Sequence, residues 1–182
     1  MTDLVPTQAS NGKTPAPAAN GADSRRVRST DVLAQLVAFE LMGEEFGVPI
    51  LEVREIILMP DITPVPQAPD FVEGVINLRG QIIPIVDLRK RFSLESKDKD
   101  KETRIVVVEI DNNVLGLVVD GNAEVVRVPE ETVRATPALI ASSIGAEFIR
   151  GIAQHDERML ILIDLHKVFS RTEIENLGNF DQ

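Results

Sequence analysis

An internal repeat is the feature of this sequence that most restricts its fold. The segment FVEGVINLRGQIIPIVDLRKRF at 71–92 aligns without gaps with FIRGIAQHDERMLILIDLHKVF at 148–169, so that aligned residues stand 77 positions apart. The residue pairs that recur unchanged in both segments are Phe71/Phe148, Gly74/Gly151, Asp87/Asp164, Leu88/Leu165, Lys90/Lys167 and Phe92/Phe169. Self-similarity of this kind indicates two copies of one supersecondary unit.

The repeat continues upstream of these segments. FELMGEEFGVPI at 39–50 resembles VEIDNNVLGLVV at 108–119, with aligned residues 69 positions apart. The two copies therefore span about 39–92 and 108–169, and each has about the length of a small five-stranded barrel. One such barrel alone would bury little surface and be marginally stable. We therefore expect two barrels packed together, with strands such as Ile82–Val86 apolar on both faces.

The hydrophobic pattern is that of short strands separated by turn residues. LEVREII suits either a helical turn or an irregular strand. The expected strands lie in LVAFELM, EFGVPI, VEGVINL, QIIPIVD, RIVVVEI, VLGLVVD, AEVVRVP, FIRGIAQ and MLILID. Many short strands favour barrels or a sandwich over a parallel α/β fold. We expect a mainly β protein with short helices, including an amphipathic helix that begins near Thr172.

The chain divides into three parts by composition. Residues 1–34 are rich in Ala, Pro, Gly, Asn and Ser without periodicity. Such a segment cannot bury enough surface to offset its ordering entropy, so a disordered N-terminal arm is predicted. Its basic run RRVR is expected to be a solvated linker, the alternative being a contact with an acidic surface. Residues 35–170 form the expected folded domain, and 171–182 a short C-terminal helix or tail.

Composition argues against several classes of function. The net charge is −10, with 29 acidic against 19 basic residues, and neither Trp nor Tyr is present. A nucleic-acid surface needs clustered cations and stacking aromatics, so none is expected. Cys is absent, which excludes disulfides and Cys-based zinc sites. No apolar run approaches the roughly 18–20 residues that span a bilayer, and no signal peptide is evident. We expect an acidic intracellular protein without direct membrane insertion.

The polar residues that could carry catalysis are few. Asp87 and Asp164 end equivalent strands, and a residue duplicated with its element is more economically explained as a helix N-cap than as half of an acid–base pair. His155 and His166 have no Cys nearby to complete a metal or nucleophilic set. The sequence contains no P-loop, no dinucleotide-binding glycine motif and no nucleophile elbow. No catalytic residue, metal or cofactor is therefore expected.

The hairpin NLRGQ contains the most informative polar residue. A tight turn there requires positive φ at Gly80, and Gly121 in VVDG is expected to have a similar structural purpose. Arg79 is either a solvated turn residue or a recognition residue. The second interpretation is favoured because Arg is a poor turn former that is common at protein interfaces, and because the aligned residue is Asp156. Pro84 cannot donate to a sheet ladder, which predicts an edge strand or an unpaired position.

At GVINLRGQIIPIVDLRKRF the chain resembles the CheW family of bacterial chemotaxis coupling proteins. FELMGEEFGVPILEVREI, VLGLVVDGNAEVVRV and FIRGIAQHDERMLILIDLHKVF fit the same pattern, so the resemblance covers about residues 35–170 in order. It implies two SH3-like five-stranded barrels around a shared hydrophobic interface. It also implies a non-enzymatic adaptor that joins the cytoplasmic tips of chemoreceptors to the histidine kinase CheA. Such a protein would be cytoplasmic and recruited to membrane-associated receptor arrays.

The same resemblance assigns residues to two surfaces. Those that would contact the receptor are Val53, Glu55, Gly74, Arg79, Gly80, Arg104, Ile105 and Val106, of which Arg104 stands at a position that is often apolar in the family. Glu55 would orient Arg79 as a charge partner. The kinase carries a regulatory domain of the same fold that docks end to end, and Arg134 and Leu139 in TVRATPAL match positions at one such end.

Two other functions are compatible with parts of the sequence. A coupling protein of this kind could belong to a chemosensory array with an output other than motility. An acidic β-barrel hydrolase using Asp87 or Asp164 is disfavoured, because no convergent nucleophile, base and oxyanion donors can be assembled.

Overall fold

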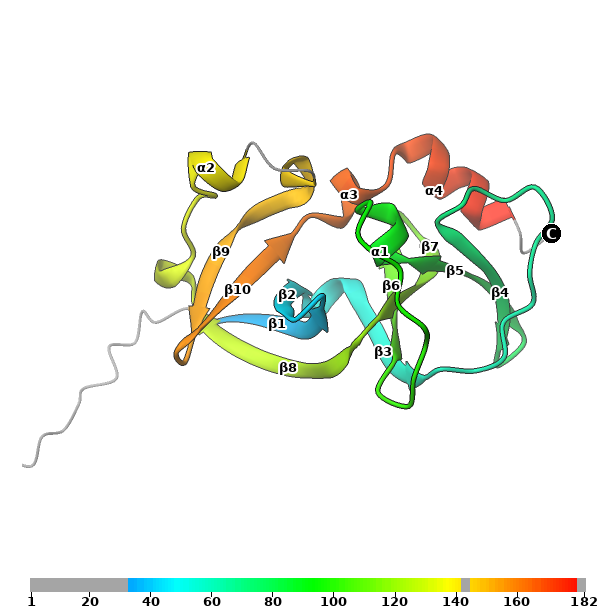
Figure 1. Ribbon diagram of the computed structural model, residues 1–182, viewed down its shortest axis with the longest axis horizontal. Coiled ribbons are helices and arrows are strands. Elements are labelled where there is room, and N and C mark those ends of the chain that lie inside the picture. The colour runs from blue at the N-terminus through cyan, green and yellow to red at the C-terminus, as the bar shows by residue number, and fades with distance from the viewer. Residues whose placement is uncertain (1–32, 142–144, 180–182) are drawn as a thin grey trace, which may run out of the picture. The chain divides into compact units, whose positions relative to one another are not determined.

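The structure is a computed structural model that describes residues 33–141 and 145–179 (Figure 1). Most of the predicted N-terminal arm lies outside the described residues. The arm was predicted to extend to residue 34. Leu33 and Ala34 belong instead to the first strand, which begins at Leu33. The predicted C-terminal helix is confirmed over Arg171–Gly178, and residues 180–182 lie outside the described residues.

Ten strands and several short helices make up the described chain. The strands are β1 (Leu33–Leu41), β2 (Glu44–Pro49), β3 (Val53–Leu58), β4 (Val72–Leu78), β5 (Gln81–Asp87), β6 (Arg104–Ile110), β7 (Asn113–Val119), β8 (Gly121–Pro129), β9 (Ile149–His155) and β10 (Arg158–Ile163). The α-helices are α1 (Leu88–Arg91), α2 (Ala138–Ala141), α3 (Leu165–Val168) and α4 (Arg171–Gly178). Three 3₁₀ turns, η1 (Ile50–Glu52), η2 (Glu130–Thr132) and η3 (Ala146–Phe148), connect strands. The ambiguous LEVREII segment is thus a 3₁₀ turn followed by a strand.

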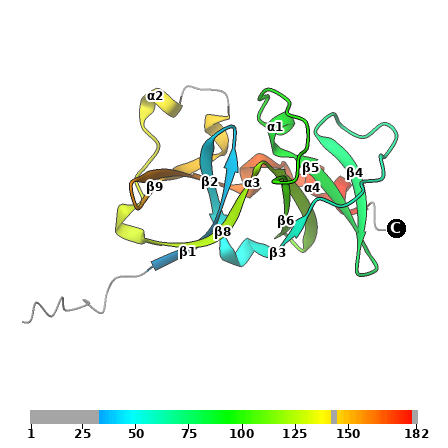
Figure 2. The same ribbon diagram turned by 60° about the horizontal axis from the view of Figure 1, so that its bottom comes forward.

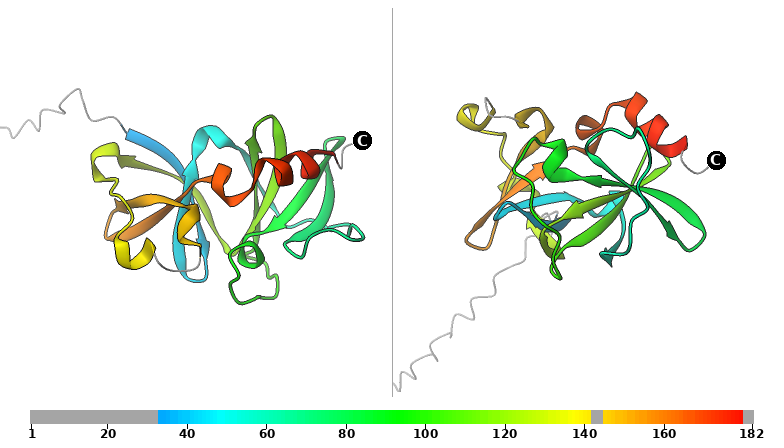
Figure 3. Two further views of the ribbon diagram at one scale, coloured as in Figure 1. Left: turned by 90° about the horizontal axis from the view of Figure 1, so that it is seen from above. Right: turned by 45° about the vertical axis from the view of Figure 1, so that its right-hand side comes forward.

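The strands form two five-stranded sheets with one topology. Barrel A has the order β8-β1-β2-β10-β9 and barrel B the order β3-β6-β7-β5-β4, and each sheet curves strongly (Figures 2 and 3). Neighbouring strands are antiparallel except for the parallel pairs β2–β10 and β5–β7. In the repeat alignment β1–β5 correspond to β6–β10. Each barrel therefore takes the first two strands of one copy and the last three strands of the other, so neither copy forms a barrel by itself.

A hydrophobic core lies between the two barrels, as the packed-barrel prediction required. It joins side chains of barrel A such as Val37 and Phe39 to side chains of barrel B such as Val86 and Leu117. Each barrel also has its own cluster of buried side chains. Strand β5 serves both regions, because Ile85 lies in the cluster of barrel B and Val86 in the shared core. The prediction of strands apolar on both faces is thus confirmed.

Pro84 lies inside a strand that pairs on both sides. Strand β5 lies between β4 and β7, so the edge-strand alternative is wrong. Pro84 is opposite Val75 of β4, whereas the parallel pairing with β7 begins one residue later, at Ile85. Its missing N–H therefore falls outside the β5–β7 register. This agrees with the second alternative, in which the N–H position of Pro84 is unpaired.

Arg91 marks the place where the two copies meet. Its guanidinium carbon lies 4.8 Å from the ring centroid of Phe71, 5.6 Å from that of Phe148 and 5.8 Å from that of Phe169. Its Nε donates a hydrogen bond of 2.7 Å to the carbonyl oxygen of Val168, which is the residue aligned with Arg91 in the other copy. Cation–π contacts and this bond replace water around a charge that is largely buried.

Candidate protein-binding surfaces

Arg79 lies at the tip of the β4–β5 hairpin. Leu78 pairs with Gln81, so Arg79 and Gly80 form a two-residue turn in which both have positive φ, 51° and 87°. The side-chain oxygen of Asn77 accepts a hydrogen bond of 2.9 Å from the Gly80 N–H. The prediction for Gly80 is confirmed. The first turn position favours Asn, Asp or Gly, so an Arg there adopts a backbone conformation that its side chain disfavours.

The guanidinium of Arg79 is held by a carboxylate from another strand. Arg79 Nη1 donates to Glu55 Oε1 at 2.5 Å and Nη2 donates to Glu55 Oε2 at 2.9 Å, which is a bidentate pair. These hydrogen bonds hold the pKa of the Glu55 carboxyl below its usual value. The Arg79 side chain remains 75% exposed. The predicted charge partnership is confirmed, and it presents an oriented guanidinium to solvent.

A shallow groove lies beside this ion pair. It has a volume of about 230 Å³, and its walls include Arg79 and Glu55 with the apolar side chains of Ile83, Val107 and Val114. Because β3 and the β4–β5 hairpin are at opposite ends of the strand order of barrel B, the Arg79–Glu55 pair bridges the two ends of the sheet. The groove thus combines apolar side chains with an oriented charge, a combination that also occurs in protein-binding sites.

Three residues assigned to the receptor surface are buried. Ile105 and Val106 have no exposed surface, and they belong to the cluster of barrel B and to the shared core respectively. Gly74 is buried with φ of 143°, and a Cβ there would overlap the carbonyl oxygen of Thr63, which pairs with Val75. These three residues therefore lie beneath the surface and do not line it.

The other assigned residues lie along β3 and β6. Val53 is partly buried against the shared core. Arg104 begins β6 opposite Leu58, three positions from Val107, which pairs with Glu55. Its Nη1 donates to the carbonyl oxygens of Lys101 and Thr103 at 2.7 and 3.0 Å. The structure therefore brings Arg79, Gly80 and Glu55 together and places Arg104 on the neighbouring strand β6, at the level of the far end of β3.

The two residues assigned to the kinase lie on barrel A. Arg134 forms an isolated bridge with Ile152, with backbone hydrogen bonds of 2.7 and 2.9 Å, and its Nη1 donates to the carbonyl oxygen of Glu131 at 3.0 Å. Leu139 lies on α2 and is 87% exposed. A groove of about 290 Å³ beside Arg134 also includes Met159, which is 57% exposed. An exposed apolar region of this kind is typical of a protein-binding surface.

The candidate catalytic residues have structural positions. Asp87 Oδ1 accepts hydrogen bonds from the N–H groups of Arg89 and Lys90, and Asp164 Oδ1 accepts one from the His166 N–H, so both are helix N-caps as predicted. His155 lies in the β9–β10 turn region, next to Asp156. Among the described residues, no group of three His, Cys, Asp or Glu side chains could hold a metal ion.

A buried ion pair escaped the sequence analysis. Arg89 Nε donates to Asp120 Oδ1 at 2.7 Å, and Asp120 Oδ2 also accepts the Met42 N–H at 2.8 Å, so α1, the β1–β2 turn and the β7–β8 junction are joined. Burial raises the pKa of Asp120, but the hydrogen bonds from Arg89 and Met42 outweigh it and hold that pKa below its usual value. The residue aligned with Arg89 is His166, so the same asymmetry that identified Arg79 could have identified Arg89.

Glu52 in η1 is a second group that the sequence analysis missed. Its Oε2 atom is buried and has no hydrogen-bond partner among the described residues. Burial raises the pKa of this carboxyl, the nearby Asp164 raises it further, and His166 and Arg150 act in the opposite direction. No sequence pattern distinguishes Glu52 from the solvated acids around it.

Comparison with known proteins agrees with this architecture. The family model of the CheW-like domain matches residues 35–173. The chain is 39% identical over 149 residues to the chemotaxis protein CheW of Treponema pallidum, an alignment that covers 80% of this chain and 87% of the relative. It is 37% identical over 145 residues to the chemotaxis protein CheW of Klebsiella aerogenes, with the same two coverages.

A solved structure is similar as well. The scaffolding protein TtCheW from Thermoanaerobacter tengcongensis superimposes with a TM-score of 0.70 at 40% sequence identity, covering 76% of this chain and 94% of that one. Within the described residues, no helix has the length and apolar character needed to cross a membrane.

Proposed function

Because this chain belongs to the CheW family, we propose that it is a non-enzymatic scaffold that couples the cytoplasmic tips of chemoreceptors to the histidine kinase CheA. It would work in the cytoplasm, recruited to membrane-associated receptor arrays. The names of its relatives support a role in chemotaxis, and its likeness to the scaffolding protein TtCheW supports a scaffold. The receptor and the kinase as partners are part of the proposal.

The Arg79–Glu55 pair is the observation that carries the receptor half of this proposal. An Arg in a left-handed turn position costs conformational energy, and Asp156 at the equivalent position of the other copy has φ of 54°, so a left-handed residue at this point of the hairpin does not require Arg. The guanidinium is exposed, oriented by two hydrogen bonds and set beside a groove with both polar and apolar walls. Recognition of a partner gives a reason for the presence of Arg79 that hairpin formation does not.

Receptor binding is tested by reversing this charge. Arg79→Glu should weaken binding to a soluble receptor-tip fragment by about tenfold or more, because an interfacial contact is lost and repulsion is added. The melting temperature should stay near that of the wild type, because exposed charges contribute little to folding. Biosensor titration and circular dichroism measure the two quantities on the same preparations. Glu55→Arg added to Arg79→Glu should restore part of the affinity.

Arg158→Glu is the matched control. Arg158 directly follows the equivalent turn in barrel A, is 58% exposed and is ion-paired with Glu45, so it is, like Arg79, an exposed and ion-paired arginine near a hairpin tip, and it lies outside the proposed receptor contact. Unchanged receptor affinity in Arg79→Glu would remove this residue from the site. Equal losses in both variants would show that net charge, rather than the Arg79 surface, controls binding.

The kinase half of the proposal is tested on barrel A. Leu139→Asp should weaken binding to the CheA regulatory domain by about tenfold and leave receptor binding unchanged, because a charge in an apolar contact is poorly solvated. Val125→Asp is the control, since Val125 is a 55% exposed apolar residue on β8. If Leu139→Asp binds CheA as the wild type does, the kinase contacts another surface.

A further inference from the structure

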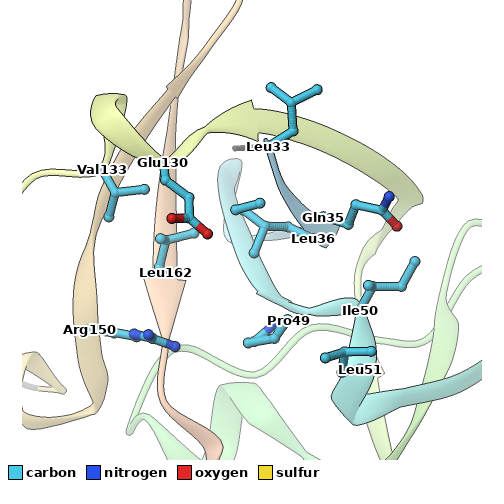
Figure 4. Close-up of a pocket in the computed structure, with 11 residues that line it drawn as sticks. Leu33, Gln35, Leu36, Pro49, Ile50, Leu51, Glu130, Val133, Arg150 and Leu162 are labelled. Atoms are coloured by element: carbon cyan, nitrogen blue, oxygen red, sulfur yellow. The ribbon is translucent and has the colours of Figure 1, made fainter. Parts of the chain in front are cut away.

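A wide cavity lies at one end of barrel A. We call it mouth A; it has a volume of about 600 Å³ and lies between the start of β1, the η1 turn, η2 and the start of β9. Figure 4 shows the apolar side chains of Leu36, Ile50, Leu51 and Leu162 around it. None of the residues assigned to the receptor or to the kinase lines it. A cavity of this size with a mostly apolar lining is typical of a binding site.

The internal repeat shows what closes the equivalent end of barrel B. That end, mouth B, has three positions aligned with mouth A: Thr103 with Ala34, Val118 with Pro49, and Asp120 with Leu51. Only about 10 Å³ remains open there. The segment Lys97–Thr103, which precedes β6, lies across it, and Thr103 is 5% exposed. Mouth B is therefore filled by a length of polypeptide.

An ion pair fastens that covering segment. Lys99 donates to a carboxylate oxygen of Glu73 at 2.6 Å, and Glu73 lies near the start of β4. The residue aligned with Glu73 is Arg150, which lies near the start of β9 and lines mouth A. The residue at this aligned position is therefore negative beside mouth B, where it is Glu73, and positive at mouth A, where it is Arg150. A segment that fills mouth A in the same way must present a carboxylate where Lys99 presents an ammonium.

Among the described residues, none covers the apolar side of mouth A. In mouth B the position of Leu51 is taken by Asp120, whose charge is neutralised by Arg89. Leu51 itself is 95% exposed, although it lies beside the cavity. An apolar side chain of a ligand would bury Leu51 together with Leu36 and Leu162, which form the floor.

The charged side chains on the rim further restrict which ligands mouth A can bind. Arg150 makes no salt bridge with any described residue, although it is near enough to Glu52 to lower the pKa of that carboxyl, and Glu130, also on the rim, makes no salt bridge with a described residue either. The two side chains lie on one side of the cavity in Figure 4. A carboxylate placed on Arg150 gains a charge-assisted bond, whereas a second carboxylate near Glu130 would be repelled.

We propose that mouth A binds an acidic–apolar peptide segment of a partner protein. A single carboxylate of the segment pairs with Arg150, and flanking apolar side chains cover Leu51 and fill the cavity above Leu36 and Leu162. The residues that precede β1 in this chain fit that chemistry poorly, since SRRVRSTDV carries three Arg against one Asp. The surface is separate from the receptor and kinase surfaces, so the two proposals can fail independently.

The probe is a library of random octapeptides displayed on phage and selected on the full chain. Selected peptides should share one Asp or Glu flanked by apolar residues. Synthetic versions should bind with at least about tenfold lower affinity to Arg150→Glu and to Leu51→Asp, measured by fluorescence anisotropy. Replacing the acidic residue of the peptide with Lys should restore binding to Arg150→Glu. Both substituted residues are exposed, so the variants should keep the wild-type melting temperature.

Arg171→Glu is the matched control, because Arg171 is an 88% exposed arginine on α4 outside mouth A. It should bind the peptides as the wild type does. Selection without a shared acidic–apolar pattern, or binding that Arg150→Glu leaves unchanged, would overturn the proposal. Binding that appears only after deletion of residues 1–30 would assign mouth A to the chain's own N-terminus instead. Self-association abolished by Leu51→Asp would assign it to a second copy.

Discussion

Gly74 and Gly151 have the same structural purpose in the two copies. A backbone segment adds to the edge of each sheet beside the glycine, through Thr63 with Val75 and through Arg134 with Ile152. A Cβ at Gly151 would lie 2.6 Å from the carbonyl oxygen of Arg134, and one at Gly74 would overlap the carbonyl oxygen of Thr63. The recurrence of glycine in the repeat is therefore explained by close approach of the backbone.

Gly74→Ala should destabilise the protein by roughly 3 kcal/mol, because it combines a positive φ with a steric clash against backbone. Urea unfolding monitored by circular dichroism measures the change. Gly43→Ala is the control, since Gly43 also has positive φ, 77°, but a Cβ there would meet nothing within 4 Å. That variant should lose only about 1 kcal/mol. Equal losses in the two variants would contradict the role given to the Thr63 segment.

Glu52 makes stability depend on pH. Burial raises its pKa, so the folded state disfavours the charged form relative to the unfolded chain. The carboxylate therefore lowers stability once the pH rises above the unfolded pKa, and the penalty is fully present above the folded pKa. Glu52→Gln should melt at a higher temperature than the wild type at about pH 7, with the difference shrinking toward about pH 4. A difference that is independent of pH would show that the charge of Glu52 is not its cause.

At the scale of elements, each short helix after a strand is fixed by a side-chain cap. Asp87 and Asp164 cap α1 and α3. Ser170 begins α4 with a capping box: its Oγ accepts the Glu173 N–H at 3.2 Å, and Glu173 Oε2 accepts the Ser170 N–H at 2.7 Å. The buried face of α4 contributes Ile174 and Leu177 to the shared core. The cap therefore sets where the apolar face of α4 begins.

Ser170→Ala should cost about 1 kcal/mol of unfolding free energy, because the Glu173 N–H loses its side-chain acceptor, Ser170 Oγ. Denaturant titration of the full chain gives this value. Ser170→Asp keeps an acceptor at the N-cap and should remain close to the wild type. If Ser170→Asp is as unstable as Ser170→Ala, the hydroxyl contributes something other than capping.

At the scale of the whole molecule, the exchange of strands makes the two copies interdependent. Strand β2 of the first copy pairs with β10 of the second, and β7 of the second pairs with β5 of the first. Neither copy can complete a five-stranded sheet from its own strands in this arrangement. Folding of one barrel requires residues from both ends of the described chain.

Fragments 33–101 and 102–179 should therefore each be largely unfolded alone, without a cooperative thermal transition in circular dichroism, whereas the intact chain should unfold in one transition. Each isolated fragment would leave apolar strands unpaired and the shared core exposed. Mixing the fragments should recover β-structure. Cooperative melting of either fragment by itself would show that a copy can close its own barrel.

The sequence by itself determined the features that depend on near neighbours. Strand positions follow from alternation, the N-caps Asp87 and Asp164 from their place before a helical turn, and the Arg79–Gly80 turn from its need for positive φ. The repeat added the duplicated unit and, through the mismatch of Arg79 with Asp156, the candidate recognition residue. These features are local, so a short stretch of sequence contains their cause.

The tertiary structure decided which strands pair, which residues the surface exposes, and where a cavity remains. Because the two copies are similar, β2 presents nearly the same pattern to β5 of its own copy as to β10 of the other, and the sequence cannot distinguish the pairings. Ile105 and Val106 were assigned to the receptor surface, but the fold buries both side chains. The segment in front of β6 fills mouth B. Each of these outcomes depends on contacts between residues far apart in the chain, which no local pattern encodes.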